Sequence, residues 1–94
     1  MNETDDAILE FFAEFEVTEF RPWLAPTAVW LNLTRNLGVL DKSRDTVSRR
    51  MGELAAMGLL ERVDEKRGYY RLTDHGVAYL EGELEADDLS PPEK

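Results

Sequence analysis

The sequence of 94 residues lacks several features on which common classes of protein depend. It contains no cysteine, which excludes disulfide bonds and thiolate metal sites and gives no indication of an oxidising compartment. No apolar run approaches the roughly 18 residues of a membrane span, and the N-terminal stretch has no basic region of the kind that opens a signal peptide. We therefore expect a cytoplasmic protein that does not associate with a membrane.

Recognisable catalytic and cofactor-binding motifs are also missing. The sequence has no glycine-rich phosphate loop, no cysteine nucleophile and no supported serine–histidine–acid pattern. The single histidine, His75, has no further metal ligands at a suitable spacing, and the many carboxylates fall in solvated runs. These absences predict a protein that is not an enzyme and has no cofactor, metal site or evident small-molecule ligand.

Lysine is scarce, with three residues beside eight arginines, and the formal net charge is −9. This charge is unevenly distributed: residues 1–20 carry −7, residues 21–73 carry +4, and residues 74–94 carry −6. An acidic surface with few lysines suits a protein that stays soluble in concentrated salt, where charge repulsion is screened within ~3 Å at about 1 M. The composition therefore indicates a halophilic source, and the positive charge lies in the middle of the chain.

The chain is long enough for one modest core, and its apolar periodicity predicts where the first elements lie. We expect an amphipathic helix of roughly three turns after an N-cap at Thr4. Residues 16–23 (EVTEFRPW) suit a short edge strand that ends in a turn. The apolar face of the helix consists of Ile8, Phe11, Phe12 and Phe15.

Two further helices are expected in the basic middle segment. The second covers about residues 26–37, because Pro26 suits the first helical position and Gly38 suits the end. The third is capped by Ser43 and ends at Gly58. Its buried stripe is expected to consist of Val47, Met51, Leu54 and Ala55.

After the third helix, the segments LLERV, DEKRG and YYRLT predict a β-hairpin with a basic tip, in which Gly68 permits the tight turn. Thr73 is placed to cap a last helix with Val77, Leu80 and Leu84 on one face. Residues 87–94 carry prolines and charges and are expected to form a flexible acidic tail. The folded domain would then span residues 1–86.

This order of elements is that of an α+β winged helix-turn-helix domain, with a three-helix core, a β-hairpin wing and a C-terminal helix. The segment TVSRRMGELAAMGLLERVDEKRGYYRLTDHGVAYLEGELEADDL, residues 46–89, resembles winged helix-turn-helix proteins of halophilic archaea that are related to the phage phi-H repressor. It is more distantly similar to MarR- and ArsR-type regulators. One departure from the pattern is TRNLGVLDKS, which lengthens the connection between the second and third helices.

The resemblance implies a sequence-specific DNA-binding transcriptional regulator. We expect this regulator to be a repressor that acts as a homodimer. Its third helix would enter the major groove of double-stranded DNA, and the wing would contact the neighbouring backbone. Independently, the apolar stripe of the third helix leaves small and cationic side chains on its outer face. A homodimer would read two half-sites, and the first and last helices offer apolar faces for pairing.

The candidate DNA-binding residues are polar or basic and belong to the third helix and the tip of the wing. Ser43 would cap the helix and direct its N-terminus at a phosphate, whereas Arg50 is better suited to a backbone contact. Only arginine can grip guanine O6 and N7 together. The full set is Ser43, Arg44, Thr46, Ser48, Arg49, Arg50, Lys66 and Arg67.

Other interpretations of the same residues remain open. Arg49 and Glu53 are four positions apart, so they could form a surface ion pair worth roughly 0.2–0.5 kcal/mol and nothing more. Lys42 and Arg35 on the lengthened connection could be phosphate ligands or ordinary solvent-exposed charges. The acidic ends also allow a different function, that of a winged-helix protein-interaction module without DNA binding.

Overall fold

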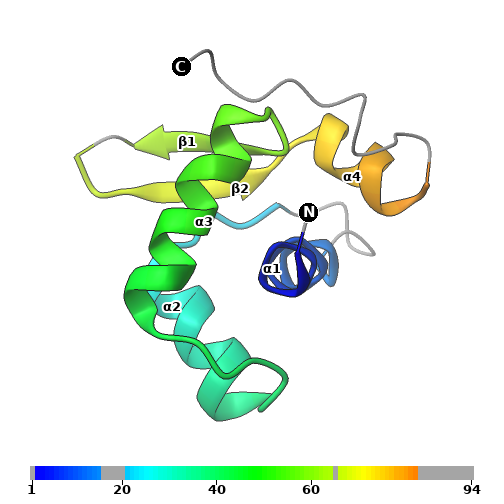
Figure 1. Cartoon of the computed structure of the whole chain (residues 1–94). Coiled ribbons are helices and arrows are strands. Elements are labelled where there is room, and N and C mark those ends of the chain that lie inside the picture. The colour runs from blue at the N-terminus through cyan, green and yellow to red at the C-terminus, as the bar shows by residue number, and fades with distance from the viewer. Residues whose placement is uncertain (1, 16–20, 65, 83–94) are drawn as a thin grey trace.

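The computed structural model describes residues 2–15, 21–64 and 66–82, which fold as helices packed against a two-stranded sheet (Figure 1). The combination of helices with an antiparallel hairpin confirms the α+β class. The hairpin extends to one side of the molecule, and α1 and α4 lie on the other. The elements are α1 (Glu3–Ala13), α2 (Pro26–Leu31), η2 (Asn32–Asn36), α3 (Arg44–Ala56), β1 (Leu60–Asp64), β2 (Tyr69–Leu72) and α4 (Asp74–Leu80).

The first helix, α1, begins two residues earlier than expected, with Asn2 and not Thr4 as its N-cap. The side chain of Asn2 accepts from the backbone N–H of Asp5 at 2.8 Å, and the Asp5 carboxylate accepts from the Asn2 N–H at 3.2 Å. Thr4 could not form such a reciprocal capping box, because the residue three positions on is Ala7. Thr4 is instead buried within the helix.

The second helix starts at Pro26 as expected, but its second half has π-helical geometry. The N–H of Leu37 donates to the carbonyl of Asn32 at 2.8 Å, a bond that spans five residues. Two polar side chains compete for nearby carbonyls, because the Thr34 hydroxyl donates to Trp30 and the Asn32 amide to Ala28. The π-turn absorbs part of the lengthened connection without breaking the helix.

The connection between η2 and α3 is fixed to the rest of the protein. The N–H groups of Val39 and Leu40 both donate to the Leu33 carbonyl, at 2.9 and 3.2 Å, and Leu40 is buried. Further along, the indole N–H of Trp30 donates to the carbonyl of Lys42 at 2.8 Å. These bonds set the position at which α3 begins.

The third helix, α3, has the expected cap at Ser43 and the expected end at Gly58, whose φ is +84°. Beyond the end, the N–H of Leu59 donates to the carbonyl of Leu54 at 3.0 Å, and Leu59 is buried. Val47, Met51 and Leu54 are fully buried, as the periodicity predicted, and Ala55 packs partly against them.

Strands β1 and β2 pair antiparallel, with Leu60 opposite Leu72 and a register shift between Arg62 and Asp64. An isolated antiparallel β-bridge extends the sheet at Leu24, which exchanges two backbone hydrogen bonds with Tyr70. Residues 21–23 form no strand, so the edge strand expected from residues 16–23 is not found there, and residues 16–20 lie outside the described residues. The isolated bridge at Leu24 lies just beyond the expected range.

The last helix, α4, is capped by Thr73 as expected, and its hydroxyl accepts from the N–H of Gly76 at 3.0 Å. Val77 and Leu80 pack against the core, while Leu84 and residues 87–94 lie outside the described residues. Part of the apolar faces of α1 and α4, which were expected to pair in a dimer, therefore packs inside the molecule. No helix among the described residues is long and apolar enough to cross a membrane.

Candidate nucleic-acid interface

Helix α3 is held by one face and exposes the other. Its buried residues join the core formed with α1, the rear of the hairpin and Leu33. At the N-terminal end, Arg44 is exposed, and Ser48 one turn later is half-buried. Arg49 follows on the exposed side of the helix. The buried stripe therefore orients small polar and cationic side chains outward, as expected from the sequence.

The N-terminal cap of α3 uses two of the candidate residues. The hydroxyl of Ser43 accepts from the backbone N–H of Thr46 at 3.1 Å, and the two side-chain oxygens are also 3.1 Å apart. The first turn of the helix thus has a defined end with an exposed Ser43. This arrangement leaves the other N–H groups of the first turn available to an anion, where the helix dipole also favours negative charge.

The two adjacent arginines of α3 have opposite environments. Among the described residues, Arg49 has no ion-pair partner, and the surface pair with Glu53 considered above is not formed. Arg50, expected to contact the DNA backbone, instead turns into the protein. Its Nε and Nη2 atoms donate to the two carboxylate oxygens of Asp5, each at 2.8 Å.

The Asp5–Arg50 ion pair joins the first turn of α1 to the middle of α3. The side chain of Asp5 is completely buried, and that of Arg50 is 19% exposed. The hydrogen bonds to Asp5 raise the pKa of Arg50, against the opposing effect of desolvation. Because Nε and Nη2 of Arg50 are engaged by Asp5, this side chain helps to hold α3 against α1. Its expected contact with the DNA backbone stays a prediction.

The tip of the wing, the β1–β2 hairpin, is organised by Asp64. Its carboxylate accepts from the backbone N–H groups of Lys66 and Arg67, both at 3.1 Å, and Gly68 follows with a φ of +69°. This turn leaves the side chains of Lys66 and Arg67 exposed. The basic tip expected from the sequence is therefore present as a formed structure.

Between the start of α2, the outer face of α3 and the wing lies a concavity of about 370 Å³, here called the cationic cleft. Four cationic side chains line it: one comes from α3, one from β1 and two from the tip of the wing. Small polar groups complete the wall. The described lining residues are Ala25, Pro26, Thr27, Arg44, Ser48, Arg62, Lys66, Arg67, Gly68 and Tyr70.

Sequence reasoning missed Arg62 and Thr27 as members of this surface. Arg62 lies opposite Tyr70 in the sheet, and its guanidinium carbon is 5.8 Å from the centroid of the Tyr70 ring. Arg62 lies two positions from the buried Leu60 and so shares its face of β1, but its side chain is exposed. Spacing along the strand therefore does not distinguish Arg62 from an ordinary surface arginine.

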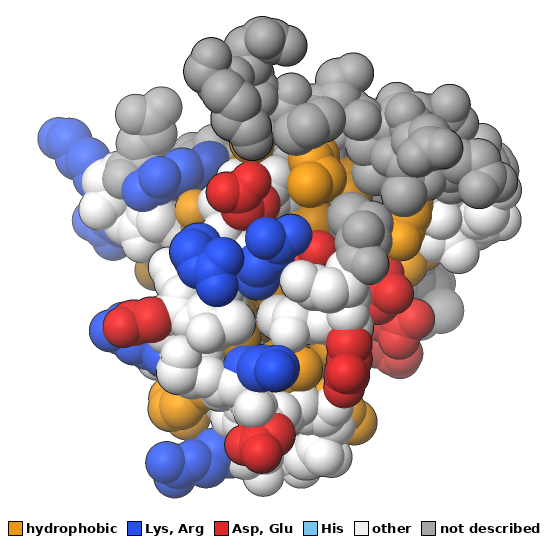
Figure 2. Space-filling model, viewed as in Figure 1, with side chains coloured by type: hydrophobic (Ala, Val, Ile, Leu, Met, Phe, Trp, Pro, Cys, Tyr) orange, Lys and Arg blue, Asp and Glu red, His pale blue; other side chains and the backbone are white. Residues whose placement is uncertain are grey.

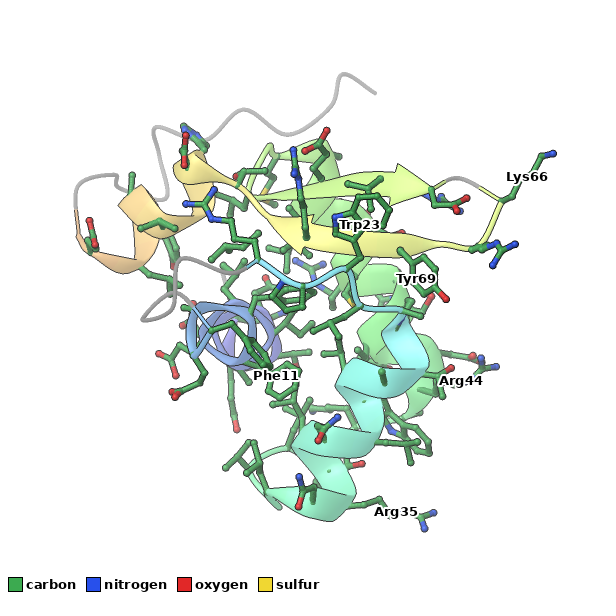
Figure 3. The ribbon with its side chains drawn as sticks, turned by 180° about the vertical axis from the view of Figure 1, so that it is seen from behind. Phe11, Trp23, Arg35, Arg44, Lys66 and Tyr69 are labelled. Atoms are coloured by element: carbon green, nitrogen blue, oxygen red, sulfur yellow. The ribbon has the colours of Figure 1, made fainter. Side chains whose placement is uncertain are left out.

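Positive charge extends beyond the cleft. Arg35 stacks on the ring of Trp30, 5.8 Å from its centroid, and projects from the same side of the molecule as Arg44 and Lys66 (Figure 3). Figure 2 shows lysine and arginine side chains gathered over the hairpin and the exposed face of α3, with acidic side chains denser towards α1. The uneven charge of the sequence is thus also a separation in space.

Among the described residues, no group of three histidine, aspartate or glutamate side chains is placed to hold a metal ion.

Comparison of the sequence with known proteins identifies a family and a relative. The sequence model of a family described as winged helix-turn-helix phage repressor matches residues 1–91. The repressor protein of Halobacterium phage phiH is 39% identical over 90 residues, which cover 95% of this chain and 89% of the relative. No solved structure has significant similarity to the chain.

Proposed function

The chain belongs to the winged helix-turn-helix phage repressor family, and on this premise we propose that it is a transcriptional repressor that binds double-stranded DNA through α3 and the wing. The observation that carries the proposal is the cationic cleft. It is lined by cationic residues of both elements that a winged helix-turn-helix protein uses to hold DNA. A regulatory role follows from the same membership.

The geometry of α3 suits the major groove. Its 13 residues span about 20 Å, and the stripe of Val47, Met51 and Leu54 keeps its outer face exposed. In this arrangement, Arg44 and Arg49 are the side chains able to reach base edges, because arginine offers a planar pair of donors to guanine. Sequence discrimination would depend mainly on these two residues.

The cationic cleft suits the phosphate backbone that borders the groove. Lys66, Arg67 and Arg62 approach from the wing, and Ser48 and Thr27 add hydroxyl donors from the helices. Contacts of this kind fix the register of the protein on the duplex without reading bases. Ser43 and Thr46 would bring the N-terminal turn of α3 to a phosphate at the edge of the same groove.

We further infer that the repressor acts as a homodimer in the cytoplasm. One α3 helix contacts only a few base pairs, and a two-fold assembly doubles the number that is read. The expected operator therefore has two half-sites about one helical turn, roughly 34–36 Å, apart. Selection of bound sequences from random DNA at several KCl concentrations measures both the preference and the half-site spacing.

Arg49→Ala tests the proposed contact directly. We expect it to weaken operator binding by about 1–3 kcal/mol, roughly 5- to 150-fold, and to relax the preference at one position of each half-site. Lys66→Ala should weaken binding to all sequences similarly and reduce the slope of log K against log salt by about 0.9. Fluorescence anisotropy with labelled operator DNA measures both effects.

Arg21→Ala is the matched control for these variants. Arg21 pairs with Asp74 at 2.9 Å, beside the start of α4, and does not line the cationic cleft. Its removal changes the net charge equally and should leave the specific affinity almost unchanged. The proposed interface would be wrong if Arg49→Ala and Lys66→Ala bound the operator as well as this control.

A further inference from the structure

A second concavity lies between α1 and the η2 segment, and here it is called the apolar groove. Its volume is about 820 Å³, more than twice that of the cationic cleft. The apolar lining comes from both sides: two aromatic residues of the α1 segment face three aliphatic residues from η2 and the connection that follows. These residues are Phe11, Phe15, Leu33, Leu37 and Val39.

The exposure of Leu37 and Val39, two residues of this lining, is set by the fold. Leu37 and Val39 are 54% and 57% exposed, a high value for branched aliphatic side chains. They cannot turn inward, because Leu40 anchors the connection in the core and the backbone of Val39 and Leu40 is bonded to Leu33. A preformed exposed apolar surface of this kind is typical of a binding site.

The edge of the groove is acidic. Glu3, Asp6, Glu10 and Glu14 line it, at intervals of three or four residues along α1 and its C-cap, and none of the described residues of the lining is lysine, arginine or histidine. Side chains at this spacing lie on one side of a helix. The groove therefore combines an apolar floor with a row of carboxylates that runs its length along α1.

Two occupants supplied by the protein itself are disfavoured by this charge. A second copy docked by a two-fold axis would bring two such rows of carboxylates together. The segment 83–94 carries five acidic residues and one lysine, so the same edge would repel it. Charge complementarity requires an occupant that is apolar on one face and cationic beside it.

We propose that the apolar groove is the docking site for a cationic amphipathic helix of a partner protein. An 11-residue α1 is about 16 Å long, which matches about three turns of a partner helix. Its apolar side chains at i, i+3, i+4 and i+7 would enter the groove, and its lysines or arginines would meet the carboxylates of α1. The side chain of Phe11 and the cations Arg44 and Lys66 lie on different sides of the molecule, so partner and DNA can bind independently (Figure 3).

The probe for this proposal is a fluorescein-labelled synthetic peptide of about 18 residues, with leucines at helical spacing and lysines on the flanks. We expect saturable binding to the full chain by fluorescence anisotropy. A peptide of the same composition in scrambled order should bind at least about 10-fold more weakly. The comparison separates docking in the groove from general attraction between a basic peptide and an acidic protein.

Two double variants test the two parts of the site. Leu37→Gln with Val39→Gln keeps the charge and should weaken peptide binding at least about 10-fold. Glu10→Gln with Glu14→Gln should weaken it and flatten its salt dependence. The matched control is Leu31→Gln, a residue 41% exposed on the neighbouring helix α2 that does not line the groove.

Operator binding and circular dichroism of each variant confirm that the fold and the DNA interface are intact. Equal binding of the ordered and scrambled peptides, or unchanged binding by the Leu37 and Val39 variant, would overturn the proposal. It would also be overturned if sedimentation showed that this variant converts a dimer into a monomer, since the occupant would then be a second copy.

Discussion

At the scale of single residues, the Asp5–Arg50 pair shows how a distant contact can determine the exposure of a charge. Arg49 and Arg50 are adjacent, yet Arg49 is exposed whereas the side chain of Arg50 is only 19% exposed. The partner of Arg50 is 45 positions away in the sequence. No local pattern could have separated the two arginines, because the deciding contact exists only after α1 has packed on α3.

Asp5→Ala should destabilise the protein by about 3–5 kcal/mol, because it leaves the Arg50 guanidinium in a largely buried place without its counter-charge. Urea denaturation followed by circular dichroism measures this loss.

Replacing both partners, as in Asp5→Leu with Arg50→Met, removes the uncompensated charge and should recover most of the stability. If the double variant were as unstable as Asp5→Ala, the loss would come from the α1 capping box, to which Asp5 also contributes, and not from the ion pair.

Tyr79 introduces a dependence on alkaline pH. Burial raises its pKa above the ordinary value of 10.0, and the charge of Asp6 and a 3.2 Å hydrogen bond from the phenol to that carboxylate act in the same direction. A raised pKa in the folded state stabilises the fold at pH values below 10, and this contribution is lost as the pH rises through the folded value.

Wild-type stability is therefore expected to fall more steeply above about pH 10 than that of Tyr79→Phe, which cannot ionise at this position. Melting temperatures from pH 8 to about 11 provide the comparison. Parallel curves for the two proteins would show that Tyr79 is not coupled to folding.

At the scale of elements, the sequence predicted the helices and the hairpin well because their signals are local. Ser43, Thr73, Gly58 and Gly68 each act through neighbours a few residues away, and the structure confirms all four. The π-turn of η2 was not predicted, since it depends on which carbonyls Thr34 and its neighbours reach once the helix exists.

The N-cap of α3 is a test of one such local signal. Ser43→Ala removes the acceptor for the Thr46 N–H and should reduce stability by about 0.5–2 kcal/mol. Ser48→Ala, one turn later, is the control and should be neutral or slightly stabilising, because alanine favours the helix interior. Both variants are measured by chemical denaturation, and equal losses would show that the Ser43 hydroxyl is not an effective cap.

The candidate site was only partly predictable at this scale. Residues on α3 and at the tip of the wing follow from helical spacing and from the turn sequence. The contribution of Arg62 and Thr27 could not follow from spacing alone, because it requires the start of α2 and strand β1 to meet α3 around one concavity. The specific DNA contacts of these residues remain predictions.

At the scale of the whole molecule, the separation of charge has a consequence for stability. Carboxylates gather along α1 while cations gather over α3 and the wing (Figure 2). Like charges on one face repel each other in dilute buffer, and salt screens that repulsion. Salt would likewise weaken the repulsion between acidic faces that opposes dimerisation. It would also weaken the attraction between the basic face and DNA.

The melting temperature should therefore rise from low to multimolar KCl, as expected for a protein adapted to concentrated salt. Thermal unfolding by circular dichroism across that range measures the effect. Glu10→Gln with Glu14→Gln should reduce the dependence, because it removes two charges from the acidic row of α1. Full stability in the absence of added salt would contradict the halophilic interpretation.

Trp30 is a natural fluorophore, and it lies against the connection between the second helix and α3, the two helices of the proposed DNA-binding unit. Its indole is hydrogen-bonded to the Lys42 carbonyl and lies under the Arg35 guanidinium. Emission from an indole changes when such neighbours move, whereas the other tryptophan, Trp23, is 55% exposed and lies near β2 (Figure 3). In a Trp23→Phe variant, the fluorescence of Trp30 would therefore report operator binding without an attached dye.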